Sequence, residues 1–391
     1  MPISDHITSD GFSPVNFIEP DRQAPKALTG TALCLSGGGY RAMVFHLGAL
    51  IRLNEAGLLK KITRISSVSG GSLTAGMLGL RWKQLTFQND VATNLMEQVI
   101  EPVRKLTETT IDAESIIGGI FLPGTISDRI ASAYKKYLFG EATLQDLPSD
   151  NEGPRFVINA TNVQSGALWR FSKPFMADYL VGMINNPTVP LAVAVAASSA
   201  FPPVLSPARL ELDHSAFTPD PKCPLQREPF TTNVMLSDGG VYDNLGLETA
   251  WKQCETILVS DGGGKMQPQA EPKTDWARHA IRVSDIVDNQ VRSLRKRQLI
   301  ECFKDSTDEH DGTYWGVRSH IQDYKVPDAL PCPEDRALEL ANTPTRLKRL
   351  EPDYQSRLIN WGYAMSDAAI RAHYTPTPAK PVGFPFPEQG V

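Results

Sequence analysis

The sequence has few of the residues that build metal centres or disulfide frameworks. Only 5 of its 391 residues are cysteine, and no two of them form a Cys-x-x-Cys pair or a cluster with histidine. This spacing argues against a structural zinc site, and a sparse, odd number of cysteines is typical of a reducing compartment. We therefore expect no metal, no cofactor and a cytoplasmic location.

Long apolar segments are missing as well. The most apolar piece, Ile116–Leu122, is far too short to cross a bilayer, which takes about 20 residues. The N-terminus lacks a basic stretch followed by an apolar run, so we expect no secretory signal. The sequence thus predicts a soluble protein whose contact with a membrane is at most peripheral.

An excess of basic residues is also absent. Lysine and arginine number 39 against 44 acidic residues, which gives a net charge of −5 and argues against a nucleic-acid partner. Basic residues gather locally in a predicted helix over 283–303. This run, Arg292–Arg297, either meets anionic lipid headgroups or is a solvated helix face. The oligomeric state stays open.

What is present is an ordinary globular composition, with 41% hydrophobic and 21% charged residues. Apolar runs and helical spacing alternate in the first part of the chain. They predict strands over 31–36 and 62–67, each followed by a helix, over 41–56 and 70–82. This βαβα pattern is typical of a parallel sheet with both faces covered. Further strands are predicted over 155–161, 233–237 and 256–260, and a small-residue helix over 189–199.

Three motifs follow predicted strands. The first, Ser36–Arg41 (SGGGYR), joins a strand to a helix, and its glycines let backbone amides approach a negative charge. A dinucleotide loop would need a glycine where Ala42 stands, and a plain structural turn is the alternative. The second, Ser67–Gly71 (SVSGG), has the strand-to-helix context of a nucleophile elbow, with Ser67 in place of the usual first glycine. Its alternative is a helix start capped by serines.

The third motif is Ser237–Asn244 (SDGGVYDN), directly after an apolar strand. An aspartate at the end of such a strand lies at the edge where α/β enzymes place their chemistry, and Gly239 and Gly240 leave room around the carboxylate. A turn capped by aspartate is the alternative. A second Asp-Gly-Gly begins at Asp261.

Together the three motifs resemble the patatin-like phospholipase family, whose pattern is Gly-Gly-Gly-x-Arg, G-x-S-x-G and Asp-Gly-Gly/Ala. The resemblance covers roughly residues 30–262 and includes Ala197–Pro203 (ASSAFPP), which is similar to the small-residue stretch ending in proline of the family. It implies a three-layer α/β fold, with a mostly parallel central sheet and helices on both faces. It also implies a serine–aspartate dyad in place of a triad.

By this resemblance Ser69 is the nucleophile and Asp238 the base. The oxyanion region is Gly37, Gly38, Gly39, Arg41 and Gly70, and the supporting glycines are Gly71, Gly239 and Gly240. The implied activity is that of a lipid acyl hydrolase of the phospholipase A or lysophospholipase type. A ligand-regulated phospholipase effector and a catalytically weak lipid-binding protein are the alternatives.

The residues alone also leave open a catalytic triad with histidine and a different aspartate as the base. An α/β-hydrolase triad requires a histidine after the aspartate, and the candidates 279, 310, 320 and 373 lack a strand-end setting. His46 falls in a predicted helix, and His214 precedes Asp238 in the predicted proline-rich surface loop over 208–230. Asp261 is the alternative base.

The resemblance implies a phospholipid or another acyl-ester lipid as the partner. Residues 116–122 and 201–205 either line an acyl cleft or belong to the core. We expect an N-terminal arm over 1–27, a patatin-like catalytic domain over 28–265, a helical C-terminal extension over 266–374 and a loose proline-rich tail over 375–391.

Overall fold

The computed structural model describes residues 28–111, 125–305 and 310–391. The predicted arm over 1–27 and the apolar piece Ile116–Leu122 lie outside these residues.

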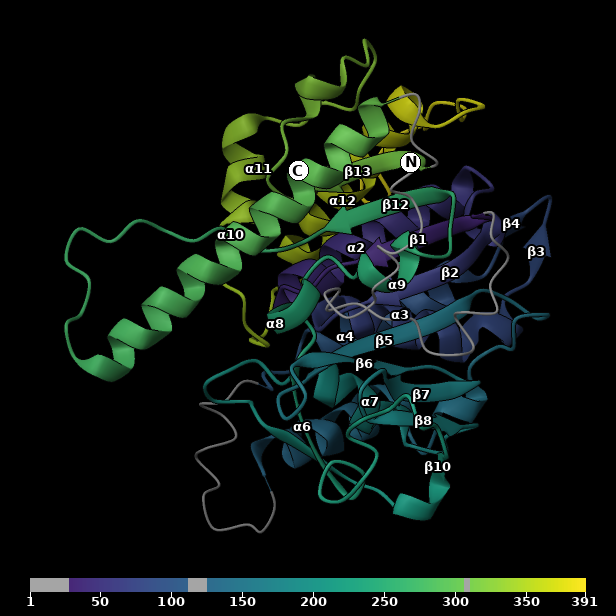
Figure 1. The fold of residues 1–391 in the computed structure, drawn as a ribbon. Helices are drawn as coiled ribbons and strands as arrows, with labels where there is room; N and C mark the ends of the chain where they lie inside the picture. The colour runs from purple at the N-terminus through teal and green to yellow at the C-terminus, as the bar shows by residue number, and fades with distance from the viewer. Residues whose placement is uncertain (1–27, 112–124, 306–309) are drawn as a thin grey trace, which may run out of the picture.

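A mixed sheet of 11 strands forms the centre of the molecule (Figure 1). Its middle is parallel and runs in the order β5 (Arg155–Asn162), β2 (Ile62–Ser67), β1 (Thr31–Leu35), β12 (Thr256–Asp261) and β13 (Asp311–Gly316). Antiparallel strands extend it beyond β5: β6 (Ala167–Phe171), β7 (Phe175–Asp178), β8 (Gly182–Asn185) and β10 (Phe217–Thr218). A further strand, β11 (Asn233–Asp238), pairs antiparallel with both β5 and β9 (Ala208–Glu211).

Helices cover both faces of the sheet. The side chains of β1 alternate between two cores, because successive residues of a strand point to opposite faces. Leu33 and Leu35 enter the larger core with α2 (Gly39–Glu55), α3 (Gly70–Arg81), α7 (Leu191–Ser198) and α12 (Pro352–His373). Ala32 and Cys34 enter the smaller core, where α9 (Glu248–Trp251) and α10 (Trp276–Lys304) pack. The predicted three-layer α/β fold is confirmed.

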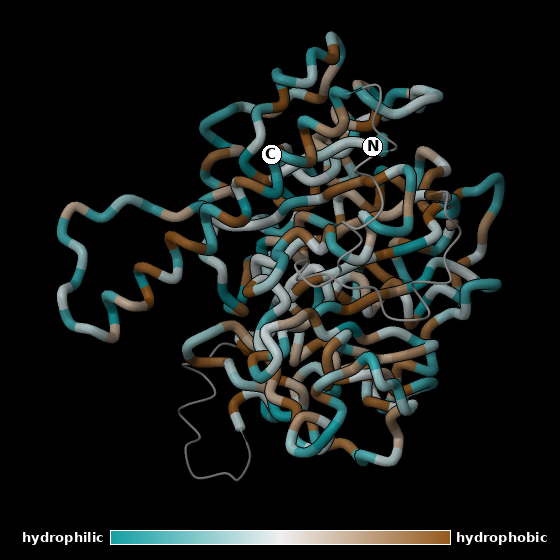
Figure 2. The backbone as a smooth tube through the Cα atoms, viewed as in Figure 1, coloured by the Kyte–Doolittle hydropathy of each residue, from teal (hydrophilic) through white to brown (hydrophobic). Residues whose placement is uncertain are grey.

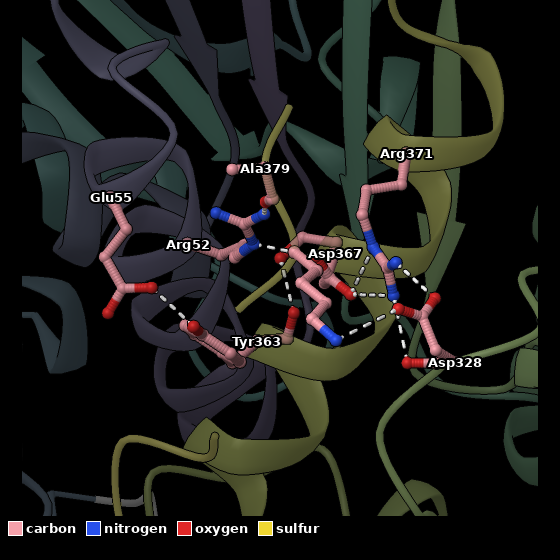
Figure 3. A network of polar contacts seen from close by, with 9 residues as sticks. Arg52, Glu55, Asp328, Tyr363, Asp367, Arg371 and Ala379 are labelled. Carbon is pink, nitrogen blue, oxygen red and sulfur yellow. Dashed lines mark hydrogen bonds and ion pairs between the residues drawn. The ribbon is translucent and has the colours of Figure 1, made fainter. Parts of the chain in front are cut away.

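The C-terminal helix belongs to the main core, because α12 lies directly on α2. A Cβ atom added to Gly362 would lie 1.9 Å from the Phe45 carbonyl oxygen, and one added to Gly48 would lie 2.0 Å from that of Ile359. Only glycine allows this approach of two backbones. A network of polar contacts continues the pairing (Figure 3), in which Asp367 accepts from Arg52 at 2.8 Å and from Arg371 at 2.9 Å.

Several segments differ from the sequence-based expectations. Helix α10 begins at Trp276, well before residue 283. Beyond α10, the extension over 266–374 that was predicted to be helical holds α11 (Glu334–Ala341) and α12, separated by the non-helical residues 342–351, which contain Pro344. The loop over 208–230 holds the short strands β9 and β10.

The proline-rich tail is not loose. The Asn360 side chain donates to the carbonyl oxygens of Phe386, at 2.7 Å, and Gly390, at 2.6 Å, and Val391 is buried. The expectation of a loose tail was therefore wrong, because a buried polar side chain on α12 uses the tail to complete its hydrogen bonds.

The remaining elements are short. The described residues between 87 and 139 hold β3 (Phe87–Gln88), β4 (Val91–Ala92), η3 (Met96–Ile100), α4 (Glu101–Leu106), α6 (Ile126–Tyr134) and η4 (Lys135–Phe139). Single turns elsewhere are η1 (Leu59–Lys61), η2 (Trp82–Gln84), η5 (Leu144–Asp146), η6 (His214–Ala216), η7 (Ile321–Tyr324) and α8 (Gly240–Asp243). Among the described helices, none has the length and apolarity needed to span a bilayer.

Candidate active site

The three sequence motifs converge at one edge of the sheet. Strands β1 and β2 are parallel neighbours, with Leu35 opposite Ser67, so the loops that follow them lie side by side. A Cβ atom added to Gly37 would lie 3.2 Å from the Ser69 Cβ atom. One added to Gly70 would lie 2.2 Å from the Gly39 carbonyl oxygen. The glycine loop therefore flanks the serine elbow in direct contact.

Asp238 reaches the same edge from the opposite direction. It ends β11, which is antiparallel to β5, and pairs with Ala160. Two residues earlier in β5, Ile158 pairs with Ser67 of β2. This register places Asp238 at the same edge of the sheet as the serine elbow. Strand β11 nevertheless runs antiparallel to β5, whereas β1 and β2, which precede the other two motifs, are parallel to β5.

Ser69 has the backbone of a nucleophile elbow. Its φ of 52° and ψ of −118° lie in a region that residues with a side chain rarely adopt, at a typical cost of about 1–3 kcal/mol. Ser198 stabilises the turn, because its hydroxyl oxygen accepts the Ser69 amide at 2.9 Å and lies 2.9 Å from the Ser72 hydroxyl. Ser69 is partly exposed and lies two residues beyond the buried end of β2.

Ser67 stands where the usual elbow pattern has glycine, and its side chain is buried beneath the elbow. Its buried hydroxyl donates to the Val157 carbonyl oxygen at 3.3 Å and accepts from Ser72 at 3.0 Å. A side chain of this size therefore fits where the family pattern has glycine.

Asp238 is almost fully enclosed, with 2% of its surface exposed. Burial raises its pKa to about 7, and hydrogen bonds from the Gly240 amide, at 2.7 Å, and from the Ser69 hydroxyl limit the rise. A carboxylate with such a pKa is suited to accept a proton near neutral pH. Its backbone is held by the Ala200 carbonyl oxygen, which accepts the Asp238 amide at 2.9 Å.

The glycine loop offers fewer free amides than the sequence suggests. The Gly37 amide donates to the Asn244 carbonyl oxygen at 3.1 Å, so it is already committed. Within the described residues, the amides of Gly38, Gly39 and Gly70 have no hydrogen-bond acceptor. Gly38 and Gly39 have φ values of 148° and 62°, a conformation that favours glycine.

Arg41 packs against the glycine loop, since a Cβ atom added to Gly38 would lie 3.2 Å from its Nη2 atom. Its buried guanidinium donates to the carbonyl oxygens of Gly262, at 2.9 Å, and of Thr343, and to the Thr345 hydroxyl at 2.9 Å. Burial lowers its pKa to about 10, so it remains charged at neutral pH. All three guanidinium nitrogen atoms of Arg41 hold neighbouring loop residues, at Gly262, Thr343 and Thr345, and its membership of the oxyanion region stays a prediction.

The alternative base, Asp261, has a different environment. Its carboxylate accepts from the Tyr314 hydroxyl at 2.6 Å and from the Gly263 amide at 2.8 Å. Burial acts to raise its pKa, but the Tyr314 hydrogen bond and the charge of Lys296 hold the pKa below its ordinary value. Asp261 is thus a poorer proton acceptor at neutral pH than Asp238.

Most of the histidines have partners elsewhere in the fold. His46 is buried between the Ser260 hydroxyl, at 2.8 Å, and the Ser36 carbonyl oxygen, at 2.9 Å. Burial lowers its pKa to about 4. Further contacts are those of His214 with Thr231, His310 with the Trp251 carbonyl oxygen and His320 with Glu334. In the described part of the chain, neither Ser69 nor Asp238 is hydrogen-bonded to a histidine.

Exposed apolar side chains stand next to the site. Phe201 and Val204 follow Ala200, the residue that holds the Asp238 amide, and both are exposed, which excludes them from the core. Val241, three residues after Asp238, is exposed as well. Leu205, by contrast, packs partly against the core.

Sequence reasoning missed three supports of the site. Ser198 lies in the ASSAFPP stretch, but nothing local indicated that it would bind the elbow 129 positions away. Asn244 holds the Gly37 amide. Residues 343–346 brace the glycine loop, since Arg346 also accepts the Tyr40 amide at 3.0 Å.

A family model and solved structures are similar to this chain. A family model described as patatin-like phospholipase matches residues 33–251. The solved structure of human GIVD cytosolic phospholipase A2 in complex with methyl gamma-linolenyl fluorophosphonate and terbium chloride is similar at 14% identity and a TM-score of 0.52, over 87% of this chain and 58% of that one. VipD from Legionella pneumophila is similar at 15% identity and a TM-score of 0.35, over 88% of this chain and 66% of that one.

This chain thus spans less than two thirds of the length of either solved structure. The likeness to the human enzyme shows the fold, and no curated protein sequence matches the chain. The family match covers more than half of the 391 residues and contains the glycine loop, the serine elbow and Asp238, and the chain therefore belongs to the patatin-like phospholipase family.

Proposed function

We propose that the protein is a lipid acyl hydrolase of the phospholipase A or lysophospholipase type, with Ser69 as nucleophile and Asp238 as base. One observation carries the proposal: the Ser69 hydroxyl, on a strained elbow, is hydrogen-bonded to a buried carboxyl group whose pKa is about 7. Membership of the patatin-like phospholipase family supports it.

Acylation starts with the transfer of the Ser69 hydroxyl proton to the Asp238 carboxylate while Oγ attacks the ester carbonyl carbon. The tetrahedral oxyanion accepts hydrogen bonds from the free amides of Gly38, Gly39 and Gly70, each worth roughly 3–4 kcal/mol when well aligned. As the intermediate collapses, the departing alcohol takes the proton from Asp238. An ester between Ser69 and the acyl chain remains.

Deacylation repeats these steps with water. Asp238 takes a proton from a water molecule, which attacks the acyl carbon, and Ser69 recovers a proton as the fatty acid leaves. No histidine is needed, because one carboxyl group with a pKa near 7 exists in both protonation states at neutral pH.

The exposed apolar residues Phe201, Val204 and Val241 favour a substrate with a long apolar chain. They border the strand end that carries Asp238, so an acyl chain entering the site would bury them. This supports a lipid ester over a small polar ester as the substrate.

Two measurements test the proposal. A fluorophosphonate probe should label the protein, with the adduct located on Ser69 by peptide mass spectrometry. Release of fatty acid should then be measured from phosphatidylcholine, phosphatidylglycerol and lysophosphatidylcholine. Ser69→Ala should abolish labelling and fatty-acid release, whereas Thr74→Ala, on the same helix but bonded to the Met43 carbonyl oxygen, should keep both. Labelling that survives Ser69→Ala would contradict the proposal.

A further inference from the structure

The side chain of Asn244 lies where three loops meet: the glycine loop, the turn after Asp238 and the turn after Asp261. A Cβ atom added to Gly37 would lie 2.5 Å from the Asn244 Oδ1 atom, and one added to Gly240 would lie 2.6 Å from the same oxygen. A Cβ atom added to Gly263 would lie 3.3 Å from the Asn244 Nδ2 atom. A side chain on Gly37 or Gly240 would displace the amide, so both glycines leave room for it.

The backbone of Asn244 is held independently of this side chain. Asn244 follows directly on α8, and its carbonyl oxygen accepts the Gly37 amide at 3.1 Å. The third loop is held from α10, because Arg292 of the basic run donates to the Gly264 carbonyl oxygen at 2.9 Å. A substitution of Asn244 can therefore remove the side-chain amide while the backbone hydrogen bond to Gly37 stays in place.

The side-chain amide of Asn244 takes no part in the hydrogen bonding of the fold. In the part of the chain that the structure describes, neither its oxygen nor its nitrogen has a hydrogen-bond partner. Asn244 is half-buried, so solvent reaches it. The chain that continues from the Gly263 loop is exposed and mostly hydrophilic over residues 267–275 (Figure 2). These surroundings suit water better than an acyl chain.

The Asn244 side-chain oxygen lies beside both groups of the proposed dyad. The Cβ atom added to Gly240 would also lie 2.9 Å from the Asp238 Oδ1 atom, so the two oxygens flank the same glycine. The Cβ atom added to Gly37 would lie 3.2 Å from the Ser69 Cβ atom. A small molecule that is hydrogen-bonded to the Asn244 oxygen is thus next to the carboxylate and the serine.

On the basis of the proposed function, we propose that Asn244 binds the water molecule that hydrolyses the acyl-enzyme. A water molecule has two hydrogen atoms to donate. One is directed to the Asp238 carboxylate, which takes it as a proton, and the other needs a second acceptor, which the Asn244 Oδ1 atom supplies. With both O–H bonds directed in this way, a lone pair of the water oxygen faces the acyl carbon on Ser69.

The step needs no further reactant. The water oxygen bonds to the acyl carbon as Asp238 takes the first proton. The bond between that carbon and Ser69 Oγ then breaks, and Oγ takes the proton from Asp238. The second hydrogen atom stays on the oxygen that becomes the hydroxyl group of the fatty acid, still donated to Asn244. Acylation uses no water molecule, so the amide should matter for deacylation alone.

The first test measures the two half-reactions separately. Asn244→Leu keeps a side chain of similar size and removes the acceptor. After mixing with p-nitrophenyl butyrate, its acyl-enzyme should accumulate in intact-protein mass spectra and hydrolyse roughly tenfold or more slowly than that of the wild type. The rate at which a fluorophosphonate labels Ser69, which reports on acylation, should stay the same. Losses of equal size in the two steps, a loss confined to labelling, or no loss in either overturn the proposal.

The matched control is Thr249→Val, in the segment that follows Asn244. The Thr249 hydroxyl lies 2.7 Å from the Ser66 hydroxyl beneath the elbow, so its removal loosens the same region without touching the amide. Labelling and deacylation should change by the same factor, and a selective loss of deacylation in this variant overturns the proposal. A wild-type protein that the fluorophosphonate fails to label contradicts the proposed hydrolase itself, whereas unchanged deacylation in Asn244→Leu contradicts only the role of the amide.

The second test restores an acceptor with Asn244→Asp, and it also decides the case in which Asn244→Leu does not fold. Above the midpoint of its pH profile, this variant should hydrolyse the acyl-enzyme at the wild-type rate. That midpoint should lie above pH 7, because a second carboxylate beside Asp238 raises the pKa of Asp238 beyond its value of about 7. Slow deacylation at every pH, or a midpoint that stays near pH 7, overturns the proposal.

Discussion

At the scale of single residues, the environment of one carboxyl group controls the proposed reaction. Asp238 must be ionised to accept the Ser69 proton, and burial raises its pKa to about 7. Below that pH the protonated, inactive form dominates, so kcat/KM should fall about tenfold per pH unit. An aspartate in water would remain active down to about pH 4. The measurement is a pH profile of ester hydrolysis between pH 5 and 9.

The control for this profile is Asp261→Asn. Because the pKa of Asp261 is held below its ordinary value, that group stays ionised throughout the range, and its removal should leave the midpoint near pH 7. A profile that is flat down to pH 5, or a midpoint that moves in Asp261→Asn, would remove Asp238 from the role of base.

Ser198 is a positioning residue in the proposed mechanism, since it holds the backbone of Ser69. Ser198→Ala removes the acceptor of the Ser69 amide and a partner of Ser72. We expect a loss of about 1–2 kcal/mol in the free energy of unfolding. Because the elbow is strained, we also expect kcat to fall roughly tenfold while KM changes little.

The matched control is Ser199→Ala, at the residue that follows α7, whose hydroxyl donates to the Val195 carbonyl oxygen of that helix at 2.8 Å. It should lose similar stability but keep kcat. Equal kcat values in the two variants would mean that Ser198 serves the fold alone.

At the scale of elements, the segment 343–346 is joined to the glycine loop through Arg41. Thr345→Val keeps the shape of the side chain but removes the hydroxyl that accepts from Arg41 at 2.9 Å. The glycine loop should become less well placed, so we expect a severalfold loss of kcat with an almost unchanged KM. Steady-state kinetics on a soluble short-chain ester measure both constants.

Arg318→Ala serves as the comparison for Thr345→Val. Arg318 donates to the Ala341 carbonyl oxygen and so fixes the same C-terminal region without a hydrogen bond to Arg41 or to the glycine loop. Its loss should lower stability without a selective loss of kcat. A loss of kcat in Arg318→Ala equal to that in Thr345→Val would show that general loosening of the region, rather than the contact to Arg41, lowers the rate.

Elements whose identity depends on neighbouring residues were predicted well from the sequence. Strands β1, β2 and β12 and helix α3 end within one residue of expectation, because apolar periodicity and glycine boundaries are local signals. The direction of β11 and the contact between Arg41 and Thr345, 304 positions apart, have no local signal. The hydrogen bond from the Gly37 amide to the distant Asn244 carbonyl oxygen has no local signal either.

At the scale of the whole molecule, the C-terminal extension is part of the same body as the patatin-like region. Helix α12 and strand β13 lie beyond residue 251, where the family match ends, yet α12 packs along α2, which begins in the glycine loop. The tail returns to α2 as well, since the Ala379 carbonyl oxygen accepts from Arg52. Opening of the extension should therefore expose the glycine loop.

Gly362→Ala tests this coupling, because the new Cβ atom would lie 1.9 Å from the Phe45 carbonyl oxygen and force α12 away from α2. Gly383→Ala is the control, since a Cβ atom there meets nothing within 4 Å. Gly362→Ala should cost several kcal/mol, a typical value for severe overpacking of a core. Hydrogen exchange should then speed up by the same factor in peptides from α12, α2 and the serine elbow. Faster exchange confined to residues 266–391 would instead mean that the extension opens on its own, and the catalytic region would then keep its activity in this variant.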